Sequence, residues 1–354
     1  MRKLLAPAAG LYGLAIKLRT AAYSRGLLRV RRLNQPVVCV GNLTVGGSGK
    51  TPLVAAITRI LARRGFKPGI LTRGYGRQGG PRLIALPPAA KREPDSRTVG
   101  DEAALLARAL PQIPMVICAD RHHGGRFAEE KFAVNVHVLD DGFQHLALRR
   151  EVDVVALDVT QPFFEDTTLP AGRLREPISG LRRAHMVVLT RVGSQSRPSL
   201  ESGLHEINAG LQVFHCRTEL EGFLEAATGN LLAPEVLRGR QVYAFCGIGN
   251  PQAFFDDLRK WGLEVTSTRQ FPDHHRYTRS ELAAMNLDRP QSGAAALITT
   301  EKDLMNLPPD WQVDVPLLAC RIEARFTEPE KFEDALLRLL EKSQVGGPAP
   351  ARPD

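Results

Sequence analysis

The chain has 354 residues, 43% hydrophobic and 24% charged, which is typical of soluble globular proteins but long for a single hydrophobic core. Its five cysteines form no CxxC pair and have no metal-ligand spacing, which indicates buried thiols in a reducing compartment. The net charge of +9 is uneven, because residues 1–92 hold 18 Lys or Arg and no Asp or Glu, so we expect an anionic partner such as nucleic acid, a phosphorylated ligand or a membrane surface.

Residues 1–32 carry eight basic residues around an apolar stretch at positions 4–16. This stretch is too short to span a bilayer. We therefore predict a basic amphipathic helix that lies in the membrane interface. A cleaved signal peptide and an ordinary solvated helix are the alternatives, and the first is disfavoured because no small-x-small cleavage site follows the stretch.

From residue 36 onward, short apolar runs alternate with helical stretches, which predicts an α/β fold with a doubly wound, mainly parallel sheet. Strands are predicted at 37–40, 69–72, 115–118, 136–139, 152–157 and 186–190. Helices are predicted at 52–64, 101–110 and 126–132. These elements make up a predicted first domain of residues 33–217.

A second alternation predicts a smaller α/β domain of residues 218–342. Its strands are predicted at 242–246, 264–268, 294–299 and 316–322, and its helices at 251–261, 280–287 and 328–341. The boundary is placed where periodicity weakens, between residues 218 and 235. The Gly/Pro-rich segment 343–354 is predicted to be disordered.

A glycine-rich loop follows the first predicted strand and opens a helix, as a P-loop does. Its main-chain N–H groups would surround phosphate, Lys50 would reach the β and γ oxygens, and the Thr51 hydroxyl would bind Mg²⁺. The consensus would place glycine at position 44, where this chain has Thr44. The predicted nucleotide-binding residues are Thr44, Val45, Gly46, Gly47, Ser48, Gly49, Lys50 and Thr51.

Two carboxylates, Asp140 and Asp141, end the strand predicted at 136–139. In P-loop enzymes a strand of this kind lies beside the P-loop strand and delivers a carboxylate to Mg²⁺ or its water. Adjacent side chains of a strand point in opposite directions, so we expect one carboxylate to serve the metal and the other a different partner. A capping or turn pair is the alternative.

Further charged residues stand at the ends of predicted elements. Asp101 begins a helix, where an acid also simply suits the helix dipole. Arg121 follows a strand end, at the sheet edge where doubly wound folds bind ligands. Arg175 lies in a loop and is either a cation for transferring phosphate or a solvated residue.

In the second predicted domain, Asp273 is followed by His274 and His275. An acid next to an imidazole is suited to general acid–base chemistry near neutral pH. A zinc site is the alternative, but it needs three or four protein ligands and no clear further cluster stands out.

The order of these motifs is similar to that of the tetraacyldisaccharide 4'-kinase family, the lipid A precursor kinases of Gram-negative bacteria. The motifs occupy residues 40–52, 73–76, 99–102, 120–121, 139–145, 169–176, 245–251, 271–274 and 300–303. That family also departs from the general P-loop consensus at the position of Thr44, so this departure supports the resemblance.

The resemblance implies a kinase that uses ATP and Mg²⁺ to phosphorylate the 4'-hydroxyl of a tetraacyldisaccharide 1-phosphate, which makes lipid IVA. It also implies a peripheral or monotopic location at the cytoplasmic face of the inner membrane, with the lipid substrate and the membrane surface as partners. Because no basic stretch is rich in aromatic residues, we expect no nucleic-acid partner, and no obligate protein partner is evident.

Residue roles also follow from the resemblance. Asp101 and His274 would form the dyad that removes the hydroxyl proton once the second domain closes over the first, although the doubled histidine leaves His274 or His275 open. The other implied catalytic residues are Lys50, Asp140, Asp141, Arg121, His145 and Arg175, and the implied magnesium ligands are Thr51, Asp141 and Glu176.

Two alternatives stay open at this point. One is a P-loop GTPase or ATPase that drives metal insertion or protein assembly, but the nearest guanine-reading candidate, residues 300–303, has the order Thr-Glu-Lys-Asp. The other is a basic module that binds membranes or nucleic acid and keeps a vestigial nucleotide site.

Overall fold

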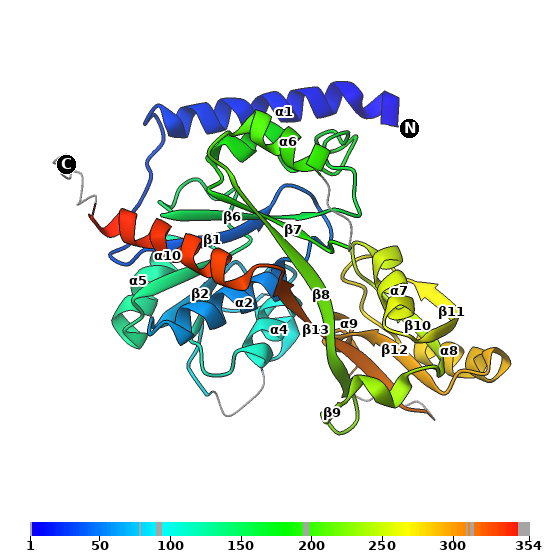
Figure 1. The fold of residues 1–354 in the computed structure, drawn as a ribbon. Helices are drawn as coiled ribbons and strands as arrows, with labels where there is room; N and C mark the ends of the chain where they lie inside the picture. Colours follow the sequence, from blue (N-terminus) through cyan, green and yellow to red (C-terminus); the bar gives the residue numbers. More distant parts are fainter. Residues whose placement is uncertain are drawn as a thin grey trace.

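One mixed sheet organises the chain in a computed structural model that describes residues 2–77, 79–89, 94–193, 198–308, 311 and 315–345. The strands are β1 Val37–Asn42, β2 Pro68–Thr72, β3 Leu83–Leu86, β4 Met115–Cys118, β5 Val136–Asp140, β6 Val152–Asp158, β7 Met186–Thr190, β8 Gln212–Glu225, β9 Leu231–Leu232, β10 Gln241–Cys246, β11 Glu264–Gln270, β12 Ala296–Thr300 and β13 Leu317–Phe326. The helices are α1 Arg2–Ser24, α2 Lys50–Arg63, α3 Ser96–Val99, α4 Asp101–Ala109, α5 Arg121–Phe132, α6 Pro198–Ile207, α7 Pro251–Lys260, α8 Arg279–Ser292, α9 Glu301–Leu304 and α10 Pro329–Val345, with 3-10 helices η1 Ile178–Arg183 and η2 Pro234–Leu237. Figure 1 shows how they are arranged around the sheet.

The strand order is β11-β10-β12-β13-β8-β7-β6-β1-β5-β2-β4-β3, with β9 beside β8. The pairs are parallel except β8 with β13, β8 with β9 and β3 with β4. Strands β1, β2, β5, β6 and β7 are buried at every position, as expected for apolar runs covered by helices on both faces. The predicted α/β class with a mainly parallel sheet is therefore confirmed.

Two apolar clusters cover opposite faces of the first half of the sheet. Val138 of β5 and Leu53 of α2 belong to the cluster on one face, whereas the next residue, Leu139, and Leu204 of α6 belong to the cluster on the other. This alternation is what a strand with helices on both sides requires. Leu336 of α10 belongs to the first cluster, so the last helix packs against the first half of the chain.

Strand β8 crosses the predicted boundary between residues 217 and 218. Its first part pairs with β7 in the first half, and its second part pairs with β13 in the second half. The strands after residue 218 thus extend the sheet of the first half. Periodicity weakens here because β8 is mostly half-buried along its length, not because the chain becomes a linker.

The predicted elements correspond to observed ones, while β3, β8, β9, α3, α6, α9, η1 and η2 were not predicted. The five cysteines are buried and unpaired, as predicted. Helix α10 continues to Val345, so the first three residues of the segment predicted to be disordered are helical. Residues 346–354 lie outside the described residues.

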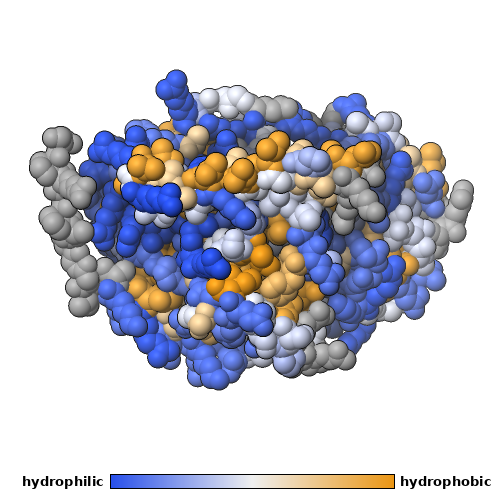
Figure 2. Space-filling model, turned by 90° about the horizontal axis from the view of Figure 1, so that it is seen from above, coloured by the Kyte–Doolittle hydropathy of each residue, from blue (hydrophilic) through white to orange (hydrophobic). Residues whose placement is uncertain are grey.

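Helix α1 lies along one side of the molecule and is attached to it by its inner face (Figure 1). Ala9 is buried, its carbonyl accepts a hydrogen bond from the Thr168 hydroxyl, and the Tyr12 hydroxyl donates to the carbonyl of Arg175 at 2.9 Å. The outer face carries exposed leucines, and Figure 2 shows an apolar band over this helix. These leucines are Leu4, Leu11, Leu14 and Leu18. Among the described residues, no helix has the length and hydropathy needed to cross a bilayer.

Candidate active site

The glycine-rich loop joins β1 to α2 as a P-loop. Gly46 and Gly49 have φ values of 104° and 75°, which side chains other than glycine rarely adopt. Gly49 is the N-cap of α2 and has no side chain with which to cap the helix, so its first N–H groups are available to an anion. Asn42 braces the loop by donating to the Ser48 hydroxyl at 2.9 Å, and the Thr190 hydroxyl donates to the Ser48 carbonyl at 3.0 Å.

The segment before Gly46 explains why Thr44 replaces the consensus glycine. Thr44 forms an antiparallel bridge with Leu174, a conformation that needs no glycine. The N–H of Val45 donates to the Arg173 carbonyl at 2.8 Å, and the N–H of Arg175 donates to the Leu43 carbonyl at 2.7 Å. Position 44 therefore belongs to a short ladder that ties the P-loop to the loop carrying Arg175.

The two carboxylates at the end of β5 have different protein partners, while the predicted metal role of one of them stays a prediction. Strand β5 lies beside β1, and Asp140 is buried, accepting a hydrogen bond from the Thr72 hydroxyl at 3.0 Å. Burial and the charges of Glu102 and Asp141 raise the pKa of Asp140 to about 7. Asp141, at φ 51°, turns towards the P-loop: Nη1 of Arg175 lies 2.7 and 2.9 Å from its oxygens and Nζ of Lys50 lies 3.5 Å away.

Asp101 and His274 meet although 173 residues separate them in the chain. Asp101 is the first residue of α4 and is 6% exposed, and its Oδ2 lies 2.7 Å from Nδ1 of His274. Although burial acts to raise it, the contacts with His274 and Lys302 hold the pKa of Asp101 below its ordinary value. The hydrogen bond that His274 donates to Asp101 raises the pKa of His274, against the opposing effects of burial and Lys302.

The doubled histidine splits between two partners. The N–H of His274 donates to the Gly247 carbonyl at 3.1 Å, in a left-handed turn with φ 60° that aims the ring at Asp101. His275 instead places Nε2 3.1 Å from the Glu281 carboxylate and stacks on Phe271. Of the two histidines, His274 therefore contacts Asp101.

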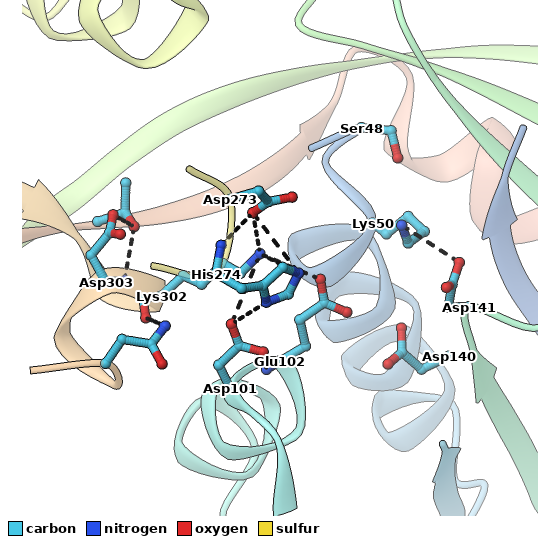
Figure 3. A network of polar contacts seen from close by, with 12 residues as sticks. Ser48, Lys50, Asp101, Glu102, Asp140, Asp141, Asp273, His274, Lys302 and Asp303 are labelled. Atoms are coloured by element: carbon cyan, nitrogen blue, oxygen red, sulfur yellow. Dashed lines mark hydrogen bonds and ion pairs between the residues drawn. The ribbon is translucent and has the colours of Figure 1, made fainter. Parts of the chain in front are cut away.

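One cavity of about 380 Å³ joins the P-loop to the second half of the chain. Its lining includes Lys50 and Thr51 on one side and His274 and Lys302 on the other. Figure 3 shows these groups in two sets, with Lys50, Asp140 and Asp141 in one and Asp101, Glu102, Asp273, His274 and Lys302 in the other. The arrangement can hold a phosphate chain at the first set and a proton acceptor at the second.

Several predicted residues are not among those described as lining this cavity, namely Thr44, Val45, Asp101, Arg121, Asp140, Asp141, His145 and Glu176. Arg121 is buried and donates to the Ala119 carbonyl at 2.9 Å. Burial and the charge of Arg121 lower the pKa of His145 to about 4. Glu176 is 2% exposed, and Nη2 of Arg183 lies 2.9 and 3.1 Å from its two oxygens. Its carboxylate is thus already engaged by a cation.

The sequence did not predict two sets of contacts that hold the site together, one made by Lys302 and one by Asp303. Lys302 lies 3.3 Å from Nε2 of His274 and 3.0 Å from Asp273, and the fully buried Asp303 accepts a hydrogen bond from the N–H of Gly247 at 2.8 Å. The signal for them was the motif at residues 300–303, which is part of the family resemblance but was given no role in the site.

The residues present fit a magnesium ion that is carried by a nucleotide. In the described part of the chain, no three His, Cys, Asp or Glu side chains form a group able to hold a metal. Mg²⁺ commonly keeps several waters and binds one or two carboxylates together with substrate phosphates. Asp141 is 31% exposed beside Lys50, and the mutual repulsion of Asp140, Glu102 and Asp141 is of the kind that a divalent cation relieves.

Comparison with known proteins decides the family. Residues 1–341 match the family model described as "Tetraacyldisaccharide-1-P 4'-kinase". The chain belongs to this family. It is 37% identical over 330 residues to the tetraacyldisaccharide 4'-kinase of Geobacter metallireducens, covering 93% of this chain and 95% of that protein. It is 42% identical over 297 residues to the enzyme of the same name from Anaeromyxobacter dehalogenans, covering 83% and 78%.

A solved member of the family has the same fold. The crystal structure titled "apo" form LpxK from Aquifex aeolicus in complex with ATP matches this chain with a TM-score of 0.74 and 30% identity. The match covers 96% of this chain and 99% of that one. These matches favour a kinase of this family over the GTPase or ATPase alternative.

Proposed function

We propose that this kinase transfers the γ-phosphoryl group of ATP to the 4'-hydroxyl of tetraacyldisaccharide 1-phosphate, the step of lipid A biosynthesis that makes lipid IVA. The observation that carries the proposal is the single cavity that holds both the P-loop lysine and His274. A phosphate donor and a hydroxyl acceptor can both enter this cavity.

The donor side of the reaction is assigned to the P-loop. Its N–H groups and Lys50 would bind the phosphates of ATP, and Mg²⁺ bound with ATP would neutralise charge on the transferring group. Arg175, which contacts Asp141, adds a second cation at the same position. Asp141 and Thr51 are the proposed protein ligands for Mg²⁺.

Glu176 is a weaker candidate for a magnesium ligand. Both of its oxygens contact Arg183, and Oε1 also accepts a hydrogen bond from Gln144 at 2.8 Å. A metal ion would have to displace these partners. We infer instead that Glu176 supports Gln144, which in turn donates to the Asn42 carbonyl below the P-loop at 2.9 Å.

The acceptor side is assigned to Asp101 and His274. When Nδ1 of His274 donates its proton to Asp101, the lone pair lies on Nε2, which can accept the proton of the sugar hydroxyl. The hydroxyl oxygen then attacks the γ-phosphorus and the bond from phosphorus to ADP breaks. Because the hydroxyl is a poor nucleophile, a general base of this kind contributes about 10²–10⁴-fold.

The N-terminal helix supports a membrane location. Four acyl chains hold the acceptor in a bilayer at about 0.8 kcal/mol per buried methylene, so the enzyme must reach the lipid there. Leu11, Leu14 and Leu18 are 70%, 53% and 63% exposed on one helix that also carries basic residues. We propose that α1 lies in the interface of the cytoplasmic face of the inner membrane, where ATP is available.

A transfer assay tests the function. The purified full chain is incubated in detergent with ATP labelled in the γ-phosphate and with the disaccharide 1-phosphate, and label is sought at the 4' position of the lipid. The Lys50→Ala variant is the matched control. ATP hydrolysis that the lipid does not stimulate, with no label on the lipid, would instead favour a P-loop hydrolase.

A further inference from the structure

Lys302 places an ammonium group in contact with the proposed base. It comes from α9, and its Nζ lies 3.0 Å from Oδ1 of Asp273 and 3.3 Å from Nε2 of His274. Asp101 and Glu102 of α4 lie 3.9 and 3.8 Å from the same nitrogen. The Lys302 side chain is 16% exposed and lines the cavity. Its ammonium contacts residues of α4 and of the loop after β11 (Figure 3), so this cation links the two halves of the chain at the site.

A buried carboxylate fixes the position of Lys302 relative to His274. Asp303 is 0% exposed. Its oxygens accept hydrogen bonds from the N–H of Gly247 and from the hydroxyls of Tyr277 and Thr300. The carbonyl of Gly247 in turn accepts a hydrogen bond from the N–H of His274. Asp303 therefore holds both the loop that carries His274 and the helix that carries Lys302. The buried hydrogen bonds of Asp303 therefore fix the contact between Lys302 and His274.

Hydrogen-bond chemistry assigns a direction to this contact. An ammonium group has three donors and no acceptor, so at 3.3 Å Lys302 can only donate to a lone pair on Nε2. We propose that Lys302 is a positioning residue of the transfer reaction, which keeps Nε2 of His274 without a proton until the acceptor hydroxyl arrives. This inference rests on the proposed function of the site.

Lys302 also acts after the transfer. The sugar hydroxyl passes its proton to Nε2, its oxygen bonds to the γ-phosphorus, and ADP leaves with the electrons of the broken phosphorus–oxygen bond. The imidazolium that results lies beside the ammonium of Lys302, and two like charges at this distance repel. The repulsion favours release of the proton to water, which resets the base.

The charges that face His274 predict how its titration responds to the loss of Lys302. Asp101 and Asp273 favour the protonated ring, and Lys302 opposes them. Glu102 faces the lysine, and the uncharged ring of Tyr75 packs on His274 with its centroid 5.3 Å away. Removing the ammonium leaves the two carboxylates unopposed, so the pKa of His274 should rise.

The test compares Lys302→Met with Lys302→Arg. A general base must be unprotonated to accept a proton, so kcat/KM decreases as the pH falls below the pKa of the base. If that pKa is higher, the decrease begins at a higher pH. Over about pH 5–9, we expect the acidic limb of the Met variant to move up by roughly one pH unit while the Arg variant keeps the wild-type limb. Asp273→Asn removes a negative charge from the same ring and should move the limb down.

Two outcomes would overturn the inference. One is an unchanged acidic limb with a raised KM for ATP in Lys302→Met, which would assign the lysine to the nucleotide. The other comes from NMR titration of the His274 ring without substrate, which measures its pKa in the wild type and in both lysine variants. A pKa that does not rise in Lys302→Met contradicts the inference even if the protein transfers no phosphate to lipid, so the two proposals fail separately. Thermal unfolding of each variant confirms that it is folded.

Discussion

The P-loop and the Asp101–His274 pair are built in contrasting ways. The P-loop is one continuous segment, and its conformation depends on glycines at fixed positions and on a neighbouring ladder. The second site is assembled from α4, the loop after β11 and α9, which belong to different halves of the chain. The first site thus depends on one segment and the strand and loop beside it, whereas the second needs elements from both halves of the chain.

This contrast predicts how each site fails. A change in the P-loop should remove a chemical function and leave the rest of the molecule intact. A change in the assembled site should affect residues that act as a unit, or disturb the way that the two halves meet. Four sets of variants sharpen or break the comparison.

Replacing Lys50 should have the largest effect. Lys50→Ala removes the cation nearest to the proposed phosphate position and should abolish transfer, a loss of about 10²–10³-fold or more. Label transfer to the lipid measures the effect, and an unchanged unfolding temperature shows that the fold is intact. Near-normal transfer would refute the P-loop assignment.

The assembled pair should behave as one unit. Asp101→Ala and His274→Ala should each lower kcat by roughly a hundred- to thousand-fold, and the double variant should be little worse than either. His275→Ala is the matched control, since that ring contacts Glu281, and it should change kcat by less than about threefold. Additive losses in the double variant would mean that the two residues do not cooperate.

Gly249 lies against the P-loop, so it tests the contact between the two halves of the chain. A Cβ atom there would lie 2.4 Å from Cα of Gly46, so Gly249→Ala must push the second half away from the P-loop. We expect a loss of kcat of roughly ten- to hundred-fold with little loss of stability, because misplacement of about 1 Å is costly to catalysis. Gly193→Ala, where an added Cβ would meet no atom within 4 Å and the backbone needs no positive φ, is the control for a glycine change alone. Full activity of Gly249→Ala would show that catalysis tolerates a displacement of the second half from the P-loop.

Helix α1 should matter for membrane binding and not for chemistry in detergent. Changing Leu11, Leu14 and Leu18 to Ser should lower partitioning onto anionic vesicles by roughly a hundredfold, because each leucine contributes about 1 kcal/mol or more when buried. Leu287→Ser on α8 is a matched control at 73% exposure. Unchanged partitioning of the triple variant would remove the membrane assignment.

The sequence predicts most of what is local. Strand β1, the glycines at positive φ and the opposed carboxylates of β5 follow from patterns a few residues long. Strand β8 could not be found in this way, because it is half-buried and shows no clear alternation. Helix α10 has a clear pattern, but nothing in the sequence says that Leu336 packs against the first half.

The candidate site likewise has a part that the sequence predicts and a part that depends on long-range packing. Motif order named Asp101 and His274, but only the fold shows that His274 rather than His275 contacts Asp101. The engagement of Glu176 by Arg183 and the approach of Lys302 to His274 are long-range contacts without a periodic signal. Charge and spacing identify which residues can react, and packing decides which of them meet.

The hydrogen bond from Tyr12 to the Arg175 carbonyl would couple the proposed membrane binding of α1 to nucleotide binding. The main chain of Arg175 holds α1, and its side chain holds Asp141 beside the P-loop. A nucleotide that moved Arg175 would change how firmly α1 is seated and therefore its affinity for a bilayer. Linkage is reciprocal, so a bilayer that moved α1 would change the affinity for nucleotide by the same factor. Lipid vesicles would then act on this kinase as an allosteric effector as well as a supply of substrate.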